Sequence, residues 1–190
     1  MTAGGTTHGL EAPFMVFATQ NPIEQEGTYP LPEAEQDRFM FAVDVGYPTE
    51  AEEIEVVKRT THGAPAAIEP VLERERLLDF QSLVRRLPTN DDVTSFAVRL
   101  ARRSRPGPDA PDFIKNFVRW GAGPRASQFL VVGARVRAAL RGHEVPHQDD
   151  VRAVAPAILR HRIQVGFRAE AEGVTSRDIV RQLLEGAERT

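Results

Sequence analysis

The 190-residue sequence contains no cysteine, and only two of its 24 basic residues, Lys58 and Lys115, are lysines. The lack of cysteine excludes disulfides, zinc–thiolate sites and cysteine nucleophiles, and it is compatible with a reducing compartment. The longest apolar runs have the length of a strand, so none could cross a bilayer. The start of the chain also lacks the basic and apolar segments of a signal peptide. We therefore expect a cytoplasmic protein with no membrane span.

The sequence also lacks an excess of positive charge, since its formal net charge is -3 and its pI is about 6.0. Binding to nucleic acid depends on clustered cations that release counterions from phosphates, so we expect no nucleic-acid partner. The one arginine-rich stretch, residues 99–105, is more typical of a solvated helix face. The basic cluster of Arg160, His161 and Arg162 has no cysteine or second histidine at ligand spacing, so we expect no metal site.

A third absence concerns nucleotide binding. A P-loop needs the pattern G-x-x-x-x-G-K-[ST], and neither Lys58 nor Lys115 follows a glycine. In P-loop proteins a second strand ends in two acidic residues that serve the magnesium site. Here the apolar run at residues 41–43 is followed by the single Asp44. The sequence therefore shows neither of the two motifs that hold Mg-ATP in P-loop proteins.

Two short apolar runs frame a polar loop in the first quarter of the chain. The run at residues 14–18 ends in Thr19, Gln20, Asn21 and Pro22, and a second run occupies residues 39–43 directly after Arg38. Continuous apolar runs of this length are typical of strands buried on both faces of a parallel sheet, with polar residues at the carboxyl end. We expect two such strands, and we note that the sequence offers them no partner strands.

From Thr49 onward the apolar residues recur with helical spacing. Capping pairs such as Thr49 with Glu52 mark helix starts, and Gly142 is typical of a helix end. The widest apolar face combines Val93, Phe96, Ala97, Leu100 and Ala101. The same spacing predicts three further apolar faces, formed by Ile54 with Val57, by Phe113 with Phe117 and Trp120, and by a set that includes Val136 and Leu140. Helices are expected over residues 49–60, from about 73 to 87, from 90 to before Pro106, 111–120 and 124–142, from 147 towards 156, and from 175 onward, with a short turn at 33–37.

Two stretches carry a resemblance to a known family. The run ATQNPIEQEGTYPLPEAEQDRF, residues 18–39, resembles the segment from sensor 1 to the arginine finger in the MoxR family of AAA+ ATPases. The later run WGAGPRASQFL, residues 120–130, resembles the sensor 2 motif of the MoxR lid. The resemblance implies that Asn21 aligns the attacking water, that Arg38 reaches the nucleotide of the next subunit, and that Arg125 contacts the ATP phosphates.

The resemblance implies a mainly α fold in which residues 1–48 are the last part of an AAA+ α/β core and residues 49–190 form the helical lid. It implies a chaperone-like ATPase that uses ATP and Mg²⁺ to remodel or activate client proteins. The expected partners are copies of the chain in a ring, hexameric in the family, and a von Willebrand factor A domain protein. Because the nucleotide-binding motifs are missing, we expect no ATP hydrolysis by residues 1–190 alone.

Several alternatives stay open at this point. The chain could be part of a full ATPase, or a catalytically inactive interaction module that docks on a complete ATPase paralogue and offers Arg38 to it. An asparagine after a strand is often only a turn former, and Arg38 and Arg125 could each be ion-paired structural groups. The cluster at residues 160–162 is expected to be lid structure or a subunit contact.

Overall fold

A computed structural model of the chain describes residues 2–20, 31–61 and 68–187. The chain divides into two compact units, one formed by residues 1–15 and 43–80 and the other by residues 16–42 and 81–190. Each unit therefore combines two separate stretches of sequence. The boundary that we predicted at residue 48 concerns family domains and remains a proposal.

The first unit contains a small hairpin and a helix. Strand β1, Thr2–Ala3, pairs antiparallel with β2, Thr6–Thr7, and Gly4 and Gly5 between them have positive φ angles. Helix α2, Glu50–Thr61, starts as predicted, with the Thr49 amide donating to a Glu52 carboxylate oxygen at 2.8 Å. Helix α3, Arg74–Arg86, begins in this unit, where Arg74 pairs with Glu11 at 3.2 Å.

The predicted inner face of α2 is not buried. Ile54 and Val57 are 48% and 52% exposed, and no residue of this helix is buried. The apolar spacing was sufficient to predict the helix, but no layer formed by the described residues of the first unit covers its face. The prediction of a buried face was therefore wrong, although the helix itself is confirmed.

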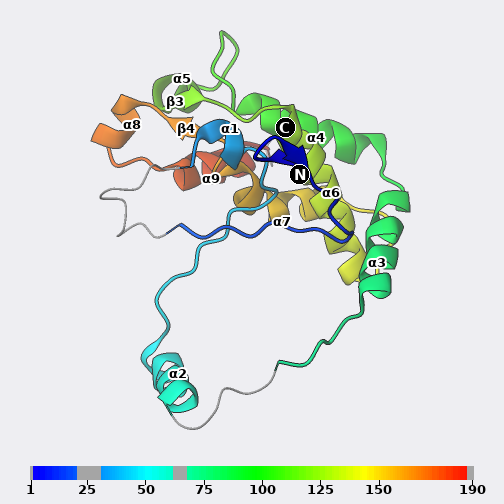
Figure 1. The fold of residues 1–190 in the computed structure, drawn as a ribbon. Coiled ribbons are helices and arrows are strands. Elements are labelled where there is room, and N and C mark those ends of the chain that lie inside the picture. The colour runs from blue at the N-terminus through cyan, green and yellow to red at the C-terminus, as the bar shows by residue number, and fades with distance from the viewer. Residues whose placement is uncertain (1, 21–30, 62–67, 188–190) are drawn as a thin grey trace. The chain divides into compact units, whose positions relative to one another are not determined.

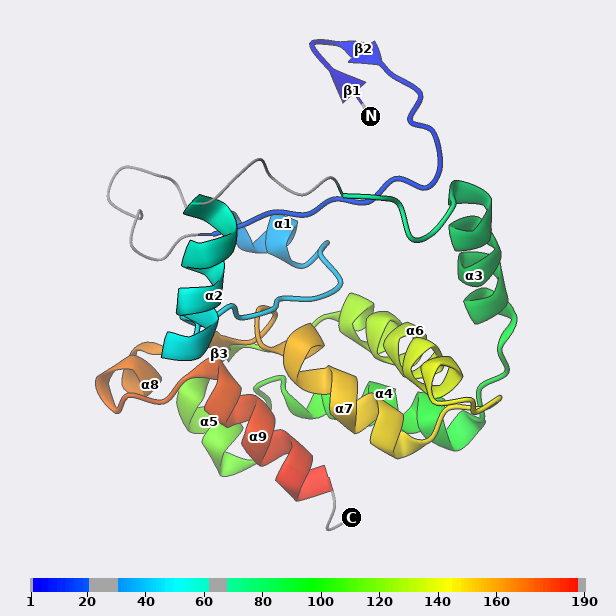
Figure 2. The same cartoon turned by 90° about the horizontal axis from the view of Figure 1, so that it is seen from below.

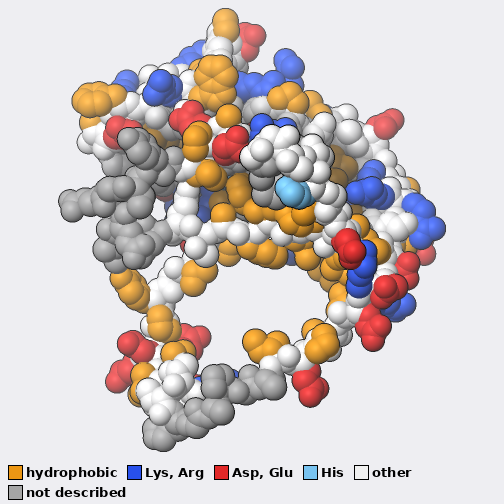
Figure 3. Space-filling model, in the orientation of Figure 1, with side chains coloured by type: hydrophobic (Ala, Val, Ile, Leu, Met, Phe, Trp, Pro, Cys, Tyr) orange, Lys and Arg blue, Asp and Glu red, His pale blue; other side chains and the backbone are white. Residues whose placement is uncertain are grey.

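Neither of the two apolar runs forms a strand. Residues 14–18 and 39–43 have no strand pairing among the described residues, and Phe17 and Val43 are 88% and 75% exposed. A parallel strand is stable only with neighbours that pair its backbone groups, and the described part of the chain supplies none for these runs. The space-filling view shows hydrophobic side chains open to solvent (Figure 3).

The second unit is built on a bundle of helices that pack closely against one another (Figures 1 and 2). Its members are α4, Asp91–Arg103; α6, Pro124–Leu140; α7, Gln148–Leu159; and α9, Ser176–Ala187. The apolar face predicted for α4 is buried as expected, because its five residues point into the common core. The predicted mainly α fold is thus confirmed. None of the helices in the described ranges is long and apolar enough to cross a membrane.

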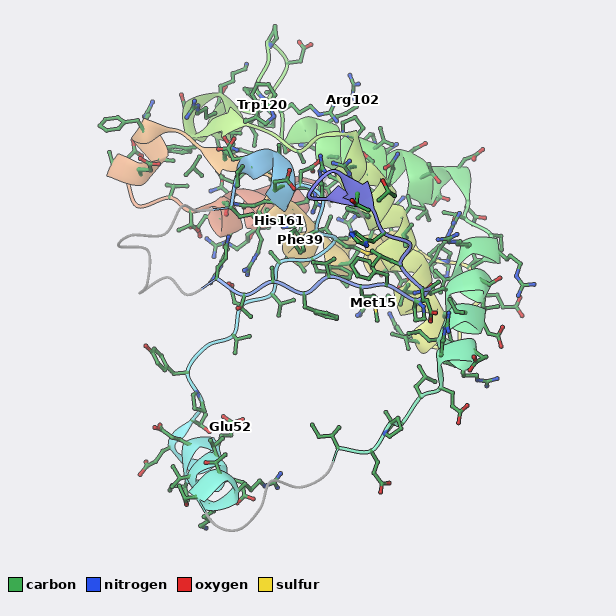
Figure 4. The ribbon with its side chains drawn as sticks, in the orientation of Figure 1. Met15, Phe39, Glu52, Arg102, Trp120 and His161 are labelled. Atoms are coloured by element: carbon green, nitrogen blue, oxygen red, sulfur yellow. The ribbon has the colours of Figure 1, made fainter. Side chains whose placement is uncertain are left out.

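Smaller elements lie beside the bundle. They are α1, Glu33–Gln36; α5, Asp112–Phe117; β3, Val118–Trp120; β4, Gln164–Val165; and α8, Phe167–Ala171. The helix expected over residues 111–120 ends at Phe117, because the next residues pair antiparallel with β4. Trp120, predicted to align with Phe113 and Phe117, is 69% exposed (Figure 4).

Helix ends were predicted more reliably than buried faces. Asp178 accepts a hydrogen bond from the Thr175 amide at 3.0 Å, Asp150 accepts one from the His147 amide at 2.9 Å, and Gly142 has a φ of 75°. On α6, however, Val136 and Leu140 are exposed, although we expected them inside. The small residues Gly133, Ala134 and Ala138 are buried instead, and a Cβ atom on Gly133 would lie only 3.2 Å from the Val154 side chain in α7.

The entry to α6 is fixed against the end of α4. Ser104 is fully buried, and its hydroxyl accepts a hydrogen bond from the Ala122 amide at 2.9 Å while it donates to the Ala101 carbonyl at 2.6 Å. A Cβ atom on Gly121 would lie only 2.3 Å from the Ser104 carbonyl oxygen. Glycine is therefore required at 121, and the approach that it permits sets where α6 and its first-turn residue Arg125 begin.

Replacement of Gly121 by alanine tests this packing. Because the added methyl group would meet backbone atoms that cannot move aside, Gly121→Ala is expected to lower the free energy of unfolding by about 1–3 kcal/mol. Gly107→Ala is the control, since nothing lies within 4 Å of a Cβ atom there. Urea unfolding followed by circular dichroism measures both variants, and equal midpoints would contradict the close approach.

Candidate functional site

The candidate site lies in the second unit, where the segment after α1 meets the end of α7. Asp37 is the residue that ends α1, and its amide donates to the Glu33 carbonyl at 3.0 Å. Five residues further along, the Ala42 amide donates to the Ala157 carbonyl in α7 at 2.9 Å. The segment between these two bonds, residues 37–42, contains Arg38, begins as a turn after α1 and lies beside the turn that follows α7.

The side chain of Arg162, in the turn that follows α7, binds this segment. Its Nε donates to Oδ1 of Asp37 at 2.9 Å and its Nη2 donates to the Asp37 carbonyl at 2.7 Å and to the Phe39 carbonyl. Its Nη1 donates to the Met40 carbonyl at 3.3 Å and to the Ile158 carbonyl at 2.5 Å. Only 1% of the side chain is exposed. Burial lowers the pKa of the guanidinium, and the hydrogen bond with Asp37 opposes that effect.

A second arginine reaches the same carboxylate. Arg125, at the second position of α6 after Pro124, donates to Oδ2 of Asp37 at 2.5 Å, and its side chain is 44% exposed. A cation in the first turn of a helix is opposed by the helix dipole by roughly 0.3–1 kcal/mol, so a nearby anion is stabilising there. The ion pair that we had kept as an alternative for Arg125 is present, and Asp37 is its partner.

Arg38, next to Asp37 in sequence, has a different environment. Its side chain is 67% exposed, and its ion-pair contact is with Glu35 on α1 at 3.9 Å. An exposed i,i+3 pair of this kind contributes little to stability. The backbone of residues 37–40 is therefore held firmly by Arg162, while the Arg38 side chain is open to solvent.

His161 completes the cluster. Its Nε2 lies 3.1 Å from the Phe39 carbonyl oxygen and 2.6 Å from Nη1 of Arg162, and Figure 4 shows His161 beside Phe39. Burial, together with the charge of Arg162, lowers the pKa of His161 to about 4. A protonated Nε2 would donate to Phe39 and an unprotonated one would accept from Arg162. The ring is neutral in both cases at neutral pH.

The structure brings two of the three predicted site residues close together through Asp37. Arg125 contacts Asp37 directly, and Arg38 follows it in the chain. Asn21 lies outside the described residues. Sequence reasoning expected Arg162 to be lid structure or a subunit contact, but it missed the pairing with Asp37. Nothing in the local pattern shows that two residues 125 apart in sequence form an ion pair. The described residues contain no group of three or more metal-ligating side chains.

Two family models match the chain. The ATPase family associated with various cellular activities (AAA) matches residues 1–41, and the AAA lid domain matches residues 113–183. The first match includes Asp37 and Arg38, and the second includes Arg125 and Arg162. The four residues of the candidate site that carry charge therefore fall within the two matched regions.

Curated relatives align along nearly the whole chain. Chaperone MoxR1 of Mycobacterium tuberculosis is 36% identical over 97% of this chain and 49% of its own length, and the uncharacterised protein YeaC of Bacillus subtilis is 35% identical over 97% and 55%. The crystal structure of a Cytophaga hutchinsonii protein provisionally assigned as an ATPase superposes with a TM-score of 0.85 at 31% identity, covering 97% of this chain and 57% of that one. The chain spans about half the length of the curated relatives that it matches.

Loss of the Arg162 guanidinium is expected to destabilise the second unit. Arg162→Gln would leave Oδ1 of Asp37 and several carbonyl groups without their donor. Breaking a buried ion pair typically costs about 3–5 kcal/mol. Because Asp37 is 31% exposed, we expect a smaller loss here, of about 2–3 kcal/mol. Arg181→Gln, which removes an exposed arginine paired with Asp178, should change stability by less than about 0.5 kcal/mol. Urea midpoints compare the two, and similar losses would argue against the structural role of Arg162.

The lowered pKa of His161 predicts a pH dependence of stability. An unfolded histidine takes up a proton near pH 6.5, but the folded one does so only near pH 4, so the unfolded state binds more protons between these values. The contribution of His161 is therefore complete above about pH 6.5 and is lost as the pH falls towards 4. After allowance for partial exposure it amounts to about 1–2 kcal/mol.

Urea unfolding at several pH values measures this effect, with His161→Gln as the comparison. The variant should lose less stability than the wild type between pH 6.5 and 4. An NMR titration of the His161 ring gives the pKa directly, and a midpoint near 6.5 would contradict the buried neutral ring.

Proposed function

Since this chain belongs to the MoxR family of AAA+ ATPases, we propose that it works as the sensor and lid part of an ATPase that remodels or activates client proteins. The observation that carries the proposal is the meeting of the two family regions at one charged cluster. Asp37, beside Arg38, is bound by Arg125 and Arg162 of the lid region. In such an arrangement, movement of the lid is transmitted directly to the segment that carries Arg38.

ATP bound to Mg²⁺ would supply the phosphoryl group whose transfer to water drives the movement. The residues of this chain fit the phosphate part of that ligand, because Arg125 already holds an anionic oxygen at 2.5 Å. Arg125 would bind phosphate oxygens from the start of α6. Its position is set by Gly121, Ala122 and the buried Ser104, which fix where that helix begins.

Arg38 would act on the nucleotide of the neighbouring subunit. Its exposure supports this role, since a side chain that is 67% exposed is available to a neighbour, and the contact with Glu35 costs little to break. The backbone on either side of it is held by Arg162. Asn21 would orient the attacking water, a role that rests on the family resemblance alone.

The partners follow from these roles. An arginine that acts on a neighbour requires a ring of subunits, which the family forms, and we propose a hexamer in the cytoplasm. A von Willebrand factor A domain protein is the proposed companion. The name of the relative MoxR1, a chaperone, supports client remodelling as the output.

A second candidate is an interaction module that docks on a complete ATPase paralogue and offers Arg38 without turnover of its own. The exposure of Arg38 supports it, because a side chain that is 67% exposed is available to such a paralogue. The DNA before the codon for Met1 distinguishes the two candidates. An in-frame P-loop motif there would support the ATPase, and a closed frame would support the module.

The trans role of Arg38 is tested in rings in which this chain is joined to a P-loop core. Arg38→Ala should lower turnover by roughly 10³–10⁵ and leave nucleotide affinity unchanged, because an arginine finger acts on the transition state. Arg181→Ala is the matched control, since that arginine is equally exposed and is also paired with an acid on its own helix. Its turnover should equal that of the wild type.

Mixing experiments then locate the arginine. Subunits with Arg38→Ala are combined with subunits that lack the magnesium-binding acid, and both parents are inactive. Activity should return at interfaces where an intact Arg38 faces an intact site. If mixed rings form and stay inactive, either Arg38 does not act across the interface or every site in the ring must hydrolyse ATP together.

A further inference from the structure

One carboxylate in the candidate site is shared by two guanidinium groups. Oδ1 of Asp37 accepts from Arg162 at 2.9 Å and Oδ2 accepts from Arg125 at 2.5 Å. The two cations thus approach a single anion from α6 and from the turn after α7. With His161 neutral, the three charged groups carry one net positive charge.

The two arginines are held very differently. Arg162 is almost wholly buried and also donates to the carbonyl groups of residues 37, 39, 40 and 158. Arg125 is 44% exposed, and Asp37 is the partner that the structure gives it. If one of the two ion pairs opens, it is the pair with Arg125, because only Arg125 has water to replace its partner.

The surroundings of Arg125 favour a further anion. The first turn of α6 contains no acidic residue, and Gly123 at its start has no side chain that could cap the free amides. The helix dipole and the guanidinium therefore present positive charge on the same side. Asp37 balances part of that charge, but it must balance Arg162 at the same time.

We propose that Asp37 is the resident counter-ion of Arg125 and that a phosphate group reaches Arg125 only by displacing it. This inference rests on the proposed function, in which Arg125 binds phosphate, and adds a residue that opposes that binding. When Arg125 turns to the phosphate, Asp37 keeps its bond to Arg162, so no carboxylate is left unpaired. The exchange therefore replaces one ion pair by another at modest cost.

The exchange also connects two parts of the site. Asp37 directly precedes Arg38 in the chain, and its carboxylate stays in an ion pair with Arg125 as long as no phosphate is bound. Opening of the ion pair with Arg125 leaves the Asp37 carboxylate bound to Arg162 alone, while His161 and Ala157 still contact the residues that follow. Asp37 is thus a positioning residue. Its ion pair with Arg125 is present without phosphate and lost with it, and this changes how the segment that contains Arg38 is held.

The test uses the full 190-residue chain and inorganic tripolyphosphate as the probe. Binding is followed by NMR through the Nε–H signals of the arginines, at fixed ionic strength. Asp37→Asn keeps an oxygen for Arg162 and removes the charge that competes at Arg125, so it should bind tripolyphosphate about three- to ten-fold more tightly than the wild type. Glu35→Gln is the matched control, because it changes the net charge equally two residues away and contacts Arg38 instead of Arg125. It should change affinity by less than about two-fold.

The outcomes separate this inference from the proposed function. Equal affinity of Asp37→Asn and wild type, including no detectable binding by either, overturns the role of Asp37, and so does an equal gain in Glu35→Gln. Adding Arg125→Gln to the Asp37→Asn chain should abolish the gain. If the gain survives, the phosphate is bound elsewhere and the role of Arg125 in the proposed function fails as well. If Asp37→Asn does not melt like the wild type, Asp37→Ser takes its place in the same comparison.

Discussion

The burial of one arginine against backbone carbonyl groups organises the functional part of this protein. Arg162 is a charge that the bundle has removed from water, and such a charge is tolerated only when its donors are satisfied. Asp37 and the carbonyl groups of residues 37, 39, 40 and 158 provide the acceptors. The segment after α1 is therefore tied to the end of α7, although it has no strand pairing of its own.

This attachment explains how residues 37–42, which pair with no described strand, can hold Arg38 in a defined place. Residues 39–43 have the composition of a buried strand, but no neighbouring strand pairs with them among the described residues. Arg162, the neutral ring of His161 and the bond from Ala42 to Ala157 hold the stretch against the lid helices instead. Arg38 projects from a backbone that is held on both sides, which suits the contact with a neighbouring subunit that we propose for it.

In this cluster the structural ion pair of Arg125 is compatible with the phosphate-binding role that we propose for it. Arg125 is paired with Asp37, which on its own would be an ordinary surface contact. The pair differs from such a contact because its carboxylate has a second, buried partner, Arg162, and stays ion-paired when Arg125 leaves. A site with one more cation than anion, placed at a helix start, is suited to exchange one oxygen anion for another.

The sequence by itself determined most of the helices, several of their ends and the family. Local rules decide these features: Thr49 with Glu52 and Thr175 with Asp178 close capping boxes, and the spacing of Val93, Phe96 and Leu100 places them on one face. The same rules failed for burial where it depends on neighbours, as in Ile54, Val57, Trp120 and Leu140, because a helical stripe does not reveal whether another layer covers it. Only the tertiary structure decided that Asp37 lies between Arg125 and Arg162. Asp37 is separated from Arg125 by 88 positions and from Arg162 by 125 positions, and no periodicity or motif in the sequence indicates that these residues meet.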